Sequence, residues 1–375
     1  DLTILHEGLL ASMRLPSAFP DFDTEVGAVS TSLLANGTWG DVNYNDGDGR
    51  SFWETGVHLQ RTILLATAFA SPLSLHHGSG EVYASAHAAL AGWLRFDFTN
   101  SNWWWNDIGT PRCVSRALLL LNATDLLDAA GTVWGRASLT FAASETGANR
   151  VWVSSVNVMR GVMERNASRV AAAFDLIHGA VEVQSDPAVG GIQLDNSFHQ
   201  HGPQFYLGWG YGAIYSAVIL SMEFVSSGTS FQMAASTWET FSSFLLDGQQ
   251  LASRGPNFDF LASGRLMTYF VQTDAYGVNL GHYHSYAAFT PFALAFPTFQ
   301  APFTTPLAVV YASLLPKIAS SSRSRASEFG DYSNRLLGTG TPMAVNKHFW
   351  TSDVVVHHRP NFSVTVRAFS NRTLN

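Results

Sequence analysis

Apolar side chains recur at helical spacing through most of this 375-residue chain before Gly338, and this pattern constrains the fold more than any other feature. It is clearest between Trp152 and Ile177, where apolar residues fall three, four and seven positions apart. Such spacing is typical of a helix with one buried face. It predicts one long helix over 152–177, whose buried face carries Trp152, Val156, Met159, Met163, Val170, Phe174 and Ile177.

Similar apolar stripes, separated by connectors rich in Gly, Asn, Asp, Ser and Pro, predict further helices. We expect them at 8–20, 54–70, 82–96, 112–128, 212–227 and 233–246. After Gly338 the pattern changes, because 353–358 and 362–369 are rich in β-branched residues and the second alternates with period two. These segments are predicted strands.

Two terminal strands cannot bury a sheet face by themselves, because isolated hairpins are marginal in water. We therefore expect a chain that is cut inside a second, β-rich domain. The predicted organisation is a helical domain over 1–335 and an incomplete β-domain over 336–375.

The composition is that of a globular protein, with 46% hydrophobic and 13% charged residues. The net charge is −7 and no block of five like charges occurs, so we expect no nucleic-acid partner and no anionic membrane surface. The longest charge-free stretch, 284–316, is divided by four prolines into pieces too short to span a bilayer. The single cysteine, Cys113, excludes an internal disulfide and a cysteine-built zinc site.

Five Asn-x-Ser/Thr sequons indicate a secreted, extracellular glycoprotein. The alternative is chance in a chain rich in Ser and Thr. No signal peptide precedes Asp1, so we expect that one was removed or was never included. The sequons begin at Asn36, Asn122, Asn166, Asn361 and Asn371.

Three consecutive tryptophans, Trp103, Trp104 and Trp105, precede a Gly-Thr-Pro helix entry. They cannot all face one core, so at least one ring is expected to be exposed in a cleft, where it suits stacking on sugar C–H faces. The alternative is that each ring anchors neighbouring helices. Asn149, just before the long helix, is either functional or a simple loop or N-cap residue.

The segment 195–212 is unusually dense in Gly, aromatic and His residues, which indicates a site. The pairs His199-x-His201 and His282-x-His284 each offer two imidazoles, but a zinc site needs three or four ligands, so we expect no metal. Arg254 and Arg265 are the first basic residues after Arg169. Any further cation at a polyanion site in this segment must therefore fold in from elsewhere.

Four segments in this order resemble polysaccharide lyase family 8, the family of chondroitin AC, hyaluronan and xanthan lyases. They are Asn102-Trp-Trp-Trp-Asn-Asp-Ile-Gly-Thr-Pro-Arg112, Thr146-Gly-Ala-Asn-Arg150, Asp195-Asn-Ser-Phe-His-Gln-His-Gly-Pro-Gln204 and Ser263-Gly-Arg265. Near the end, Lys347-His-Phe-Trp350 and the segment 355–367 look like the opening strands of the family's central β-domain.

The resemblance implies a mainly α fold, an incomplete α/α toroid followed by the first strands of an antiparallel β-sandwich, with the substrate in a cleft along the toroid. It also implies a catalytic set of Asn149, His201, Tyr211 and Arg265, with the three tryptophans as a sugar-binding patch. The further candidates for substrate contact are Asn106, Arg112, Arg150, Gln204, Trp209 and Arg254. We expect a monomer that acts on an anionic polysaccharide, without a cofactor; a structural calcium ion in a further domain stays open.

Two departures from the family pattern stand out. His201 and Tyr211 are ten positions apart, one more than in the relatives whose loop is most similar, so Trp209-Gly-Tyr must bulge to present the phenol. Tyr269 stands where many relatives carry a second arginine. The family also uses an acidic residue of the β-domain, which we expect just beyond Asn375.

The implied reaction is β-elimination on a uronic acid, chondroitin or hyaluronan above all, in which C5 loses a proton, O4 leaves and a 4,5-double bond forms. Asn149 would neutralise the uronate carboxylate, and either Tyr211 or His201 would be the base. Two alternatives stay open: a non-catalytic glycan-binding protein, and a toroid glycoside hydrolase with paired carboxylates such as Asp107 and Asp195.

Overall fold

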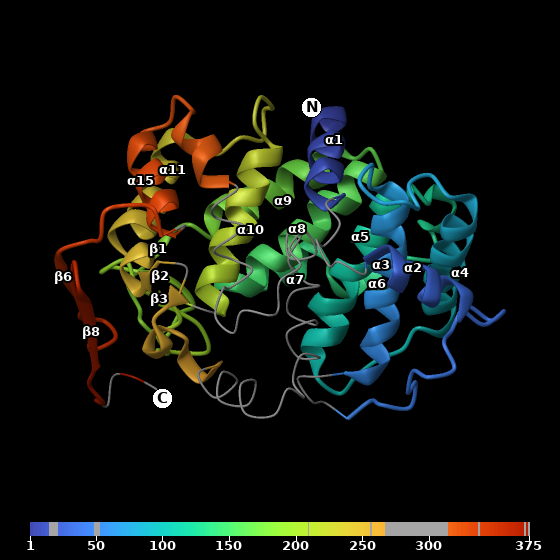
Figure 1. Ribbon diagram of the computed structural model, residues 1–375, viewed down its shortest axis with the longest axis horizontal. Coiled ribbons are helices and arrows are strands. Elements are labelled where there is room, and N and C mark those ends of the chain that lie inside the picture. The colour runs from blue at the N-terminus through green and yellow to red at the C-terminus, as the bar shows by residue number, and fades with distance from the viewer. Residues whose placement is uncertain are drawn as a thin grey trace.

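The computed structural model describes residues 1–14, 22–48, 53–208, 210–255, 257–266, 314–336, 338–370 and 373. Helices make up most of it, and a three-stranded antiparallel sheet follows them (Figure 1). In Figure 1 the helices form an arc from α2 and α4 on the right, through α8 in the centre, to α11 and α15 on the left. The described helices include none long and apolar enough to cross a bilayer.

The bounds of the helices are α1 Leu2–Met13, α2 Phe22–Thr31, α3 Val57–Ala70, α4 Gly80–Phe96, α5 Thr110–Leu121, α6 Gly131–Arg136, α7 Leu139–Ser144, α8 Gly147–Met163, α9 Ala167–Gly179, α10 Tyr211–Val225, α11 Ala235–Asp247 and α15 Ala326–Leu336. Short helical turns occur at η1 Glu54–Gly56, η3 Thr124–Leu126, η4 Gln249–Ala252, η5 Phe260–Ala262 and η6 Gly264–Leu266. A π-helical turn, η2 Trp105–Gly109, leads into α5.

The prediction of one helix over 152–177 is wrong, because two helices, α8 and α9, share that stretch. Arg165 between them adopts a left-handed conformation with φ 54°. Asn166 then caps α9 by accepting a hydrogen bond from the Arg169 backbone at 3.0 Å. A Cβ on Gly161 would lie 2.7 Å from Val170, so the two helices pack closely just after the turn. Their apolar faces continue one another, which is why the periodicity did not show the break.

The other helix predictions need smaller corrections. The helix predicted at 8–20 begins at Leu2 and ends at Met13, and α2 had no predicted counterpart. The helix predicted at 112–128 ends at Leu121, because Asn122 takes a left-handed conformation with φ 50° that terminates it. The helices predicted at 54–70, 82–96, 212–227 and 233–246 are confirmed as α3, α4, α10 and α11, within three residues at each end.

The core is centred on α5, α8 and α10, in which nearly every side chain is buried. Tryptophans fill much of the space between the helices. Trp93, Trp105, Trp134, Trp152 and Trp238 are each no more than 2% exposed. Rigid packing of this kind holds the ends of α8 and α10 in fixed positions, and these ends carry the site.

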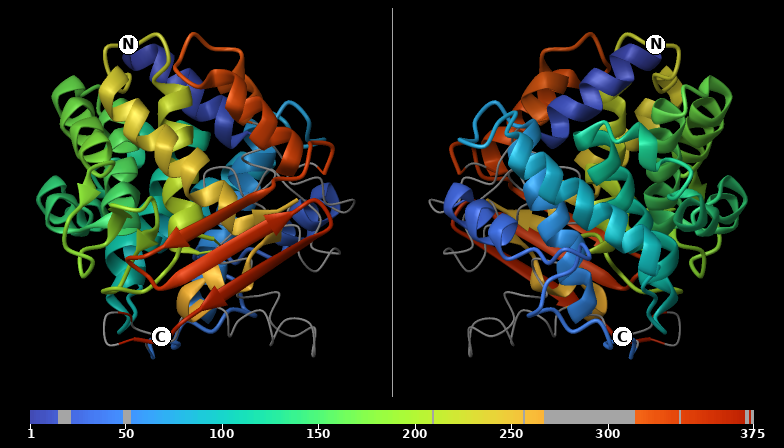
Figure 2. Two further views of the ribbon diagram at one scale, coloured as in Figure 1. Left: turned by 90° about the vertical axis from the view of Figure 1, so that its left-hand side faces the viewer. Right: turned by 90° about the vertical axis from the view of Figure 1, so that its right-hand side faces the viewer.

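The terminal sheet has the order β6-β7-β8, with β6 Val345–Phe349, β7 Val354–Arg359 and β8 Phe362–Arg367 paired antiparallel. The two strands predicted from the residue pattern are therefore confirmed as β7 and β8. One face buries Phe349, Val354 and Val356. Figure 2 shows this sheet lying across one side of the helical part.

Short strands lie in the loops beneath the sheet. A three-stranded unit joins β1 Val183–Gln184, β2 Gly191–Gln193 and β3 Phe198–His199. A second pair joins β4 Ser253–Arg254 and β5 Asn257–Phe258. The loop that carries His201 therefore follows β3, and the segment that carries Arg265 follows β5.

Candidate active site

Three of the four predicted catalytic residues are in direct contact. The Arg265 guanidinium lies 3.2 Å from Nε2 of His201 and donates to the Tyr211 hydroxyl at 3.5 Å. The rings of His201 and Tyr211 meet edge to face, with centroids 4.8 Å apart. Tyr211 is only 6% exposed, whereas His201 and Arg265 are exposed. We call these three residues the catalytic cluster.

Tyr211 is held by the glycines on either side of it. Gly210 has φ 100° and ψ −132°, a conformation that favours glycine, and it turns the chain so that Tyr211 is the first residue of α10. A Cβ on Gly212 would lie 2.0 Å from the Tyr206 carbonyl oxygen, which accepts the Gly212 N–H at 3.0 Å. Only glycine fits there. Trp209, predicted to bulge and to contact substrate, lies outside the described residues.

Arg265 is positioned by the same loop. Gly208 donates its N–H to the Ala262 carbonyl at 2.8 Å, which draws the 262–265 segment towards Tyr211. Gly264 has φ 54°, and a Cβ there would lie 2.5 Å from the Tyr206 ring. The Tyr206 hydroxyl accepts the Arg265 N–H at 3.3 Å. Tyr206 therefore fixes the backbone position from which the Arg265 side chain extends. The sequence did not reveal this role.

His201 is neutral in this arrangement. A guanidinium only donates hydrogen bonds, so Nε2 is the acceptor and the ring proton is on Nδ1. Partial burial of the ring and, second, the charge of Arg265 lower the pKa of His201 to about 4. At neutral pH, therefore, Arg265 and not His201 carries the positive charge beside the Tyr211 hydroxyl.

Asn149 lies in the first turn of α8 and is 5% exposed, so the reading of this residue as an N-cap is wrong; Thr146 is the N-cap. Its amide donates to Glu145 at 2.9 Å, and its Oδ1 is buried without a hydrogen-bond partner. The residue before His201, Gln200, accepts the Ala148 N–H at 3.1 Å. This bond ties the His201 loop to the start of α8, next to Asn149.

An aromatic row leads from the tryptophans to the catalytic cluster. Trp104 packs edge to face on Trp152 with centroids 5.5 Å apart, and Trp152 contacts Tyr211 at 5.8 Å. Trp105 is 2% exposed and belongs to the core, whereas Trp103 is 45% exposed and meets Phe141 at 6.2 Å. The prediction that at least one of the three rings is exposed is confirmed. Trp152 was not among the predicted site residues.

Two of the residues predicted to contact substrate, Arg112 and Arg254, interact with other parts of the protein. Arg112 is 4% exposed and lies 5.5 Å from the centre of the Trp152 ring, and burial lowers its pKa to about 9. The prediction that Arg112 contacts substrate stays untested, and α5 turns the side chain towards the core and against Trp152. Arg254 donates to the carbonyls of Arg359 and Pro360 and to the Ser363 hydroxyl, on the β7–β8 turn rather than at the catalytic cluster.

The remaining candidates have local partners. Arg150 donates to the backbone carbonyls of Glu145 and Ala143 at the end of α7. The Asn106 amide exchanges two hydrogen bonds with the backbone of Asn100. Gln204 donates to the His201 carbonyl at 3.3 Å, and its Oε1 is buried without a hydrogen-bond partner. Of these three, only Gln204 touches the catalytic cluster.

The histidine pairs give no metal site in the part of the chain that is described. His199 has both ring nitrogens bonded, to the Pro187 carbonyl and to the Ser352 hydroxyl, each at 2.7 Å. No group of three His, Cys, Asp or Glu side chains suited to a metal occurs among the described residues. His282 and His284 lie outside them, as does Tyr269.

Asp195 anchors the loop to the sheet. Its Oδ1 accepts from the backbone and hydroxyl of Ser197, and its Oδ2 accepts from the backbone and hydroxyl of Thr351. A buried carboxylate with four donors is saturated, and it is not poised as the acid or base of a hydrolase. Burial raises the pKa of the other carboxyl of that alternative, Asp107.

The helical part and the terminal strands each match a family model. The N-terminal α-helical domain of polysaccharide lyase family 8 matches residues 25–266. The chain belongs to polysaccharide lyase family 8. The super-sandwich domain of the same family matches residues 344–375, so the resemblance seen in the sequence is confirmed.

The similar curated proteins are bacterial. Chondroitinase-AC of Pedobacter heparinus is 26% identical over 238 residues, which cover 62% of this chain and 33% of the relative. Hyaluronate lyase of Thermasporomyces composti is 28% identical over 197 residues, covering 50% and 24%. Xanthan lyase of a Bacillus species is 24% identical over 280 residues, covering 68% and 29%. The chain spans a third or less of the length of these relatives.

Solved structures confirm the fold. A chondroitinase AC lyase, solved in oligosaccharide complexes, gives a TM-score of 0.78 at 20% identity, covering 99% of this chain and 50% of that one. A Paenibacillus xanthan lyase gives 0.67 at 19% identity, covering 99% and 37%. The predicted fold class, an α/α toroid followed by antiparallel strands, is thereby confirmed.

Proposed function

We propose that this chain carries the catalytic centre of a lyase that cleaves a uronic-acid glycan of the chondroitin or hyaluronan type by β-elimination. The observation that carries the proposal is the contact of Arg265 with both His201 and Tyr211, beside the start of α8 where Asn149 lies. The similarity to a chondroitinase, a hyaluronate lyase and a xanthan lyase supports the same class of substrate.

Tyr211 is the proposed base and acid. The Arg265 charge, 3.5 Å from the hydroxyl, favours the phenolate, which is otherwise scarce at neutral pH because a free phenol has a pKa near 10. The phenolate takes the proton from C5, and the C5–H electron pair forms the C4=C5 double bond. The C4–O4 bond breaks, and the phenol returns the proton to O4, which becomes the hydroxyl of a new reducing end.

His201 is a weaker candidate base. A pKa of about 4 makes its imidazole less basic than an ordinary histidine, and its acceptor nitrogen already receives a hydrogen bond from Arg265. We propose that it positions Arg265 and supports the Tyr211 ring, on which it packs edge to face. For these reasons we favour Tyr211 over His201 as the base, a choice that the sequence left open.

Asn149 is proposed to stabilise the charge that builds up on the uronate carboxylate when C5 loses its proton. One of its two N–H groups is bonded to Glu145, and the second is the proposed donor to the carboxylate. A preorganised donor of this kind is worth about 3 kcal/mol of transition-state stabilisation. Trp103 and Trp104 are proposed to bind the sugar rings beside the cleavage point.

The experiment is to incubate the protein with chondroitin, hyaluronan and xanthan and to follow the near-ultraviolet absorbance of an unsaturated uronate. Tyr211→Phe is expected to abolish product formation while oligosaccharide binding persists. Tyr215→Phe is the matched control, because it lies one turn further along α10 and its hydroxyl bonds the buried Ala180 carbonyl. It should lower stability by about 1 kcal/mol and leave turnover in place.

Each other outcome has a distinct meaning. Substantial activity of Tyr211→Phe would remove Tyr211 from the role. New reducing ends without absorbance would indicate a hydrolase, and binding without either product would indicate a non-catalytic glycan-binding protein.

We further propose secretion, since a polymeric substrate is met outside the cell. Four sequon asparagines, Asn36, Asn122, Asn166 and Asn361, are exposed, as glycan acceptors must be. Asn371 lies outside the described residues. Glycosidase treatment of the protein isolated from its source, followed by mass spectrometry, tests whether these sites are modified. The proposal also takes the working protein to be a monomer.

A further inference from the structure

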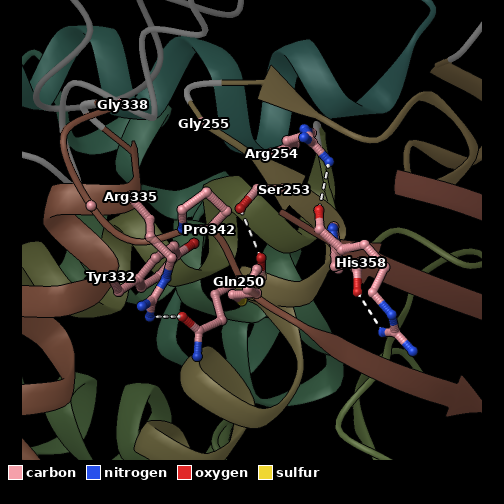
Figure 3. Close-up of a pocket in the computed structure, with 12 residues that line it drawn as sticks. Gln250, Ser253, Arg254, Gly255, Tyr332, Arg335, Gly338, Pro342 and His358 are labelled. Atoms are coloured by element: carbon pink, nitrogen blue, oxygen red, sulfur yellow. Dashed lines mark hydrogen bonds between the residues drawn. The ribbon is translucent and has the colours of Figure 1, made fainter. Parts of the chain in front are cut away.

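A cavity of about 380 Å³ lies where the helical part meets the sheet. Its walls come from η4 and β4, from α15, from β7 and from the segment 338–343 (Figure 3). No residue of the catalytic cluster lines it, and neither does Asn149. It is therefore a separate feature of the molecule, and its size suits a sugar-sized group.

Three arginines, Arg254, Arg335 and Arg359, line this cavity, and none of its described lining residues is acidic. Elsewhere in the molecule arginines pair with carboxylates, as Arg61 does with Asp41. Among the described residues, none of the three cavity arginines has a carboxylate within ion-pair distance. The cavity is thus a concentration of positive charge in a chain whose net charge is −7.

The arginines are held in place by neutral groups only. Arg335 donates to Oε1 of Gln250 at 2.7 Å, and its Nε is buried without a hydrogen-bond partner. Arg359 donates to the neighbouring carbonyl of His358. Arg254 donates to two carbonyls and a hydroxyl of the β7–β8 turn. Neutral acceptors orient the guanidinium groups without an ion pair, although the pKa of Glu328 is lowered by its hydrogen bond to Arg325 and, less, by the charge of Arg335. Guanidinium groups that no carboxylate directly pairs are available to an anion.

The placement of the charges indicates what kind of anion fits. The three arginines come from different elements, and Figure 3 shows Arg335 and Arg254 on opposite sides of Ser253. Arginines that line one cavity from different elements suit a ligand with several separated acidic groups better than a single small ion. Carboxylates and sulfates match the planar guanidinium donors. Pro342 and Met343 add an apolar surface on which a sugar ring can lie.

We propose that this cavity, which we call the arginine pocket, is a second binding site for an acidic saccharide, apart from the catalytic cluster. The inference rests on the proposed function for the identity of the saccharide. Occupation of this site would hold the polymer on the protein while the cluster acts on another part of it.

The experiment measures the binding of a chondroitin sulfate hexasaccharide by isothermal titration calorimetry, with all variants made on a Tyr211→Phe background to prevent turnover. Two sites per chain are expected. Arg335→Gln and Arg359→Gln should each weaken the second site at least fivefold and leave the first unchanged. Arg359→Gln guards against misfolding, because the single hydrogen bond of its side chain is to its neighbour's carbonyl. The matched control is Arg95→Gln, an exposed arginine that also donates to one backbone carbonyl.

The outcomes separate the claims. One site per chain, or two sites unchanged in both pocket variants, would overturn the inference. Inorganic sulfate that competes fully for the second site at the same concentration would show a simple oxyanion site and overturn the assignment to a saccharide. If the second site binds hexasaccharide but the unaltered protein, with Tyr211 in place, makes no unsaturated product, the arginine pocket stands and the proposed function is rejected.

Discussion

Replacing Gly264 by alanine tests how the Arg265 guanidinium is positioned. The backbone at Gly264 is left-handed, with φ 54°, and a Cβ there would lie 2.5 Å from the Tyr206 ring. A non-glycine residue in this conformation costs about 1–2 kcal/mol. Forcing an added methyl into a packed site costs about 1–3 kcal/mol more. We therefore expect Gly264→Ala to lower the free energy of unfolding by about 2–5 kcal/mol.

Gly255 is a matched control for this substitution. Its φ is 57°, and a Cβ there would meet no atom of the described residues within 4 Å. Gly255→Ala should therefore show only the conformational cost of about 1–2 kcal/mol. The difference between the two variants isolates the steric conflict with Tyr206. Urea unfolding of both variants and of the unaltered protein measures it.

The catalytic activity of the same two variants gives a second test. Tyr206 accepts the Arg265 N–H, so a displaced Tyr206 ring shifts the guanidinium away from Tyr211. A displacement of about 1 Å at a reacting group can cost 10²-fold in rate. We expect kcat/KM of Gly264→Ala to fall by about that factor, and that of Gly255→Ala to change little. Equal stability losses in the two variants, or an unchanged kcat/KM in Gly264→Ala, would refute the reasoning.

Four further outcomes are expected. Arg265→Gln should raise the pKa of His201 from about 4 towards 6.5 without reaching it, since partial burial remains; an NMR titration that shows no rise contradicts this. Between pH 6.5 and about 4 the unfolded chain binds a proton at His201 that the folded chain does not, so stability should fall as the pH falls through this window, and less so in His201→Gln. Cys113 is buried, and burial raises its pKa to about 12, so a thiol reagent should label it only on unfolding. Asp195→Asn should cost about 1–3 kcal/mol in urea unfolding, because it disrupts the bonds to Thr351; unchanged stability would contradict the anchoring role.

The helical fold could be predicted well from the sequence, because a helix with one buried face produces a local periodicity of apolar residues. The prediction failed at the turn between α8 and α9. The apolar periodicity continues from one helix to the next, and the break is marked by the left-handed backbone of Arg165. The sequence also failed to show which way Arg112 points. A cation next to a tryptophan motif suggests substrate contact, yet packing on Trp152 turns it inwards.

The candidate site was predictable in its residues but not in its geometry. The family resemblance named His201, Tyr211 and Arg265, and the structure brings them into contact. The roles of Tyr206 and Trp152 depend on contacts between distant segments, which no local pattern encodes. The lowered pKa of His201 depends on the same contacts, because burial and a guanidinium 64 positions away cause it.

The anchoring of the His201 loop by the sheet has a practical consequence for engineering. Asp195 and His199 bond to Thr351 and Ser352 in the β6–β7 turn, only a few positions before His201. A chimera that grafts a foreign sheet onto this toroid must therefore keep hydroxyl side chains at both turn positions. A graft that omits these hydroxyl groups would remove the hydrogen bonds that hold the His201 loop in place. We expect it to lower turnover even if every residue of the catalytic cluster is retained.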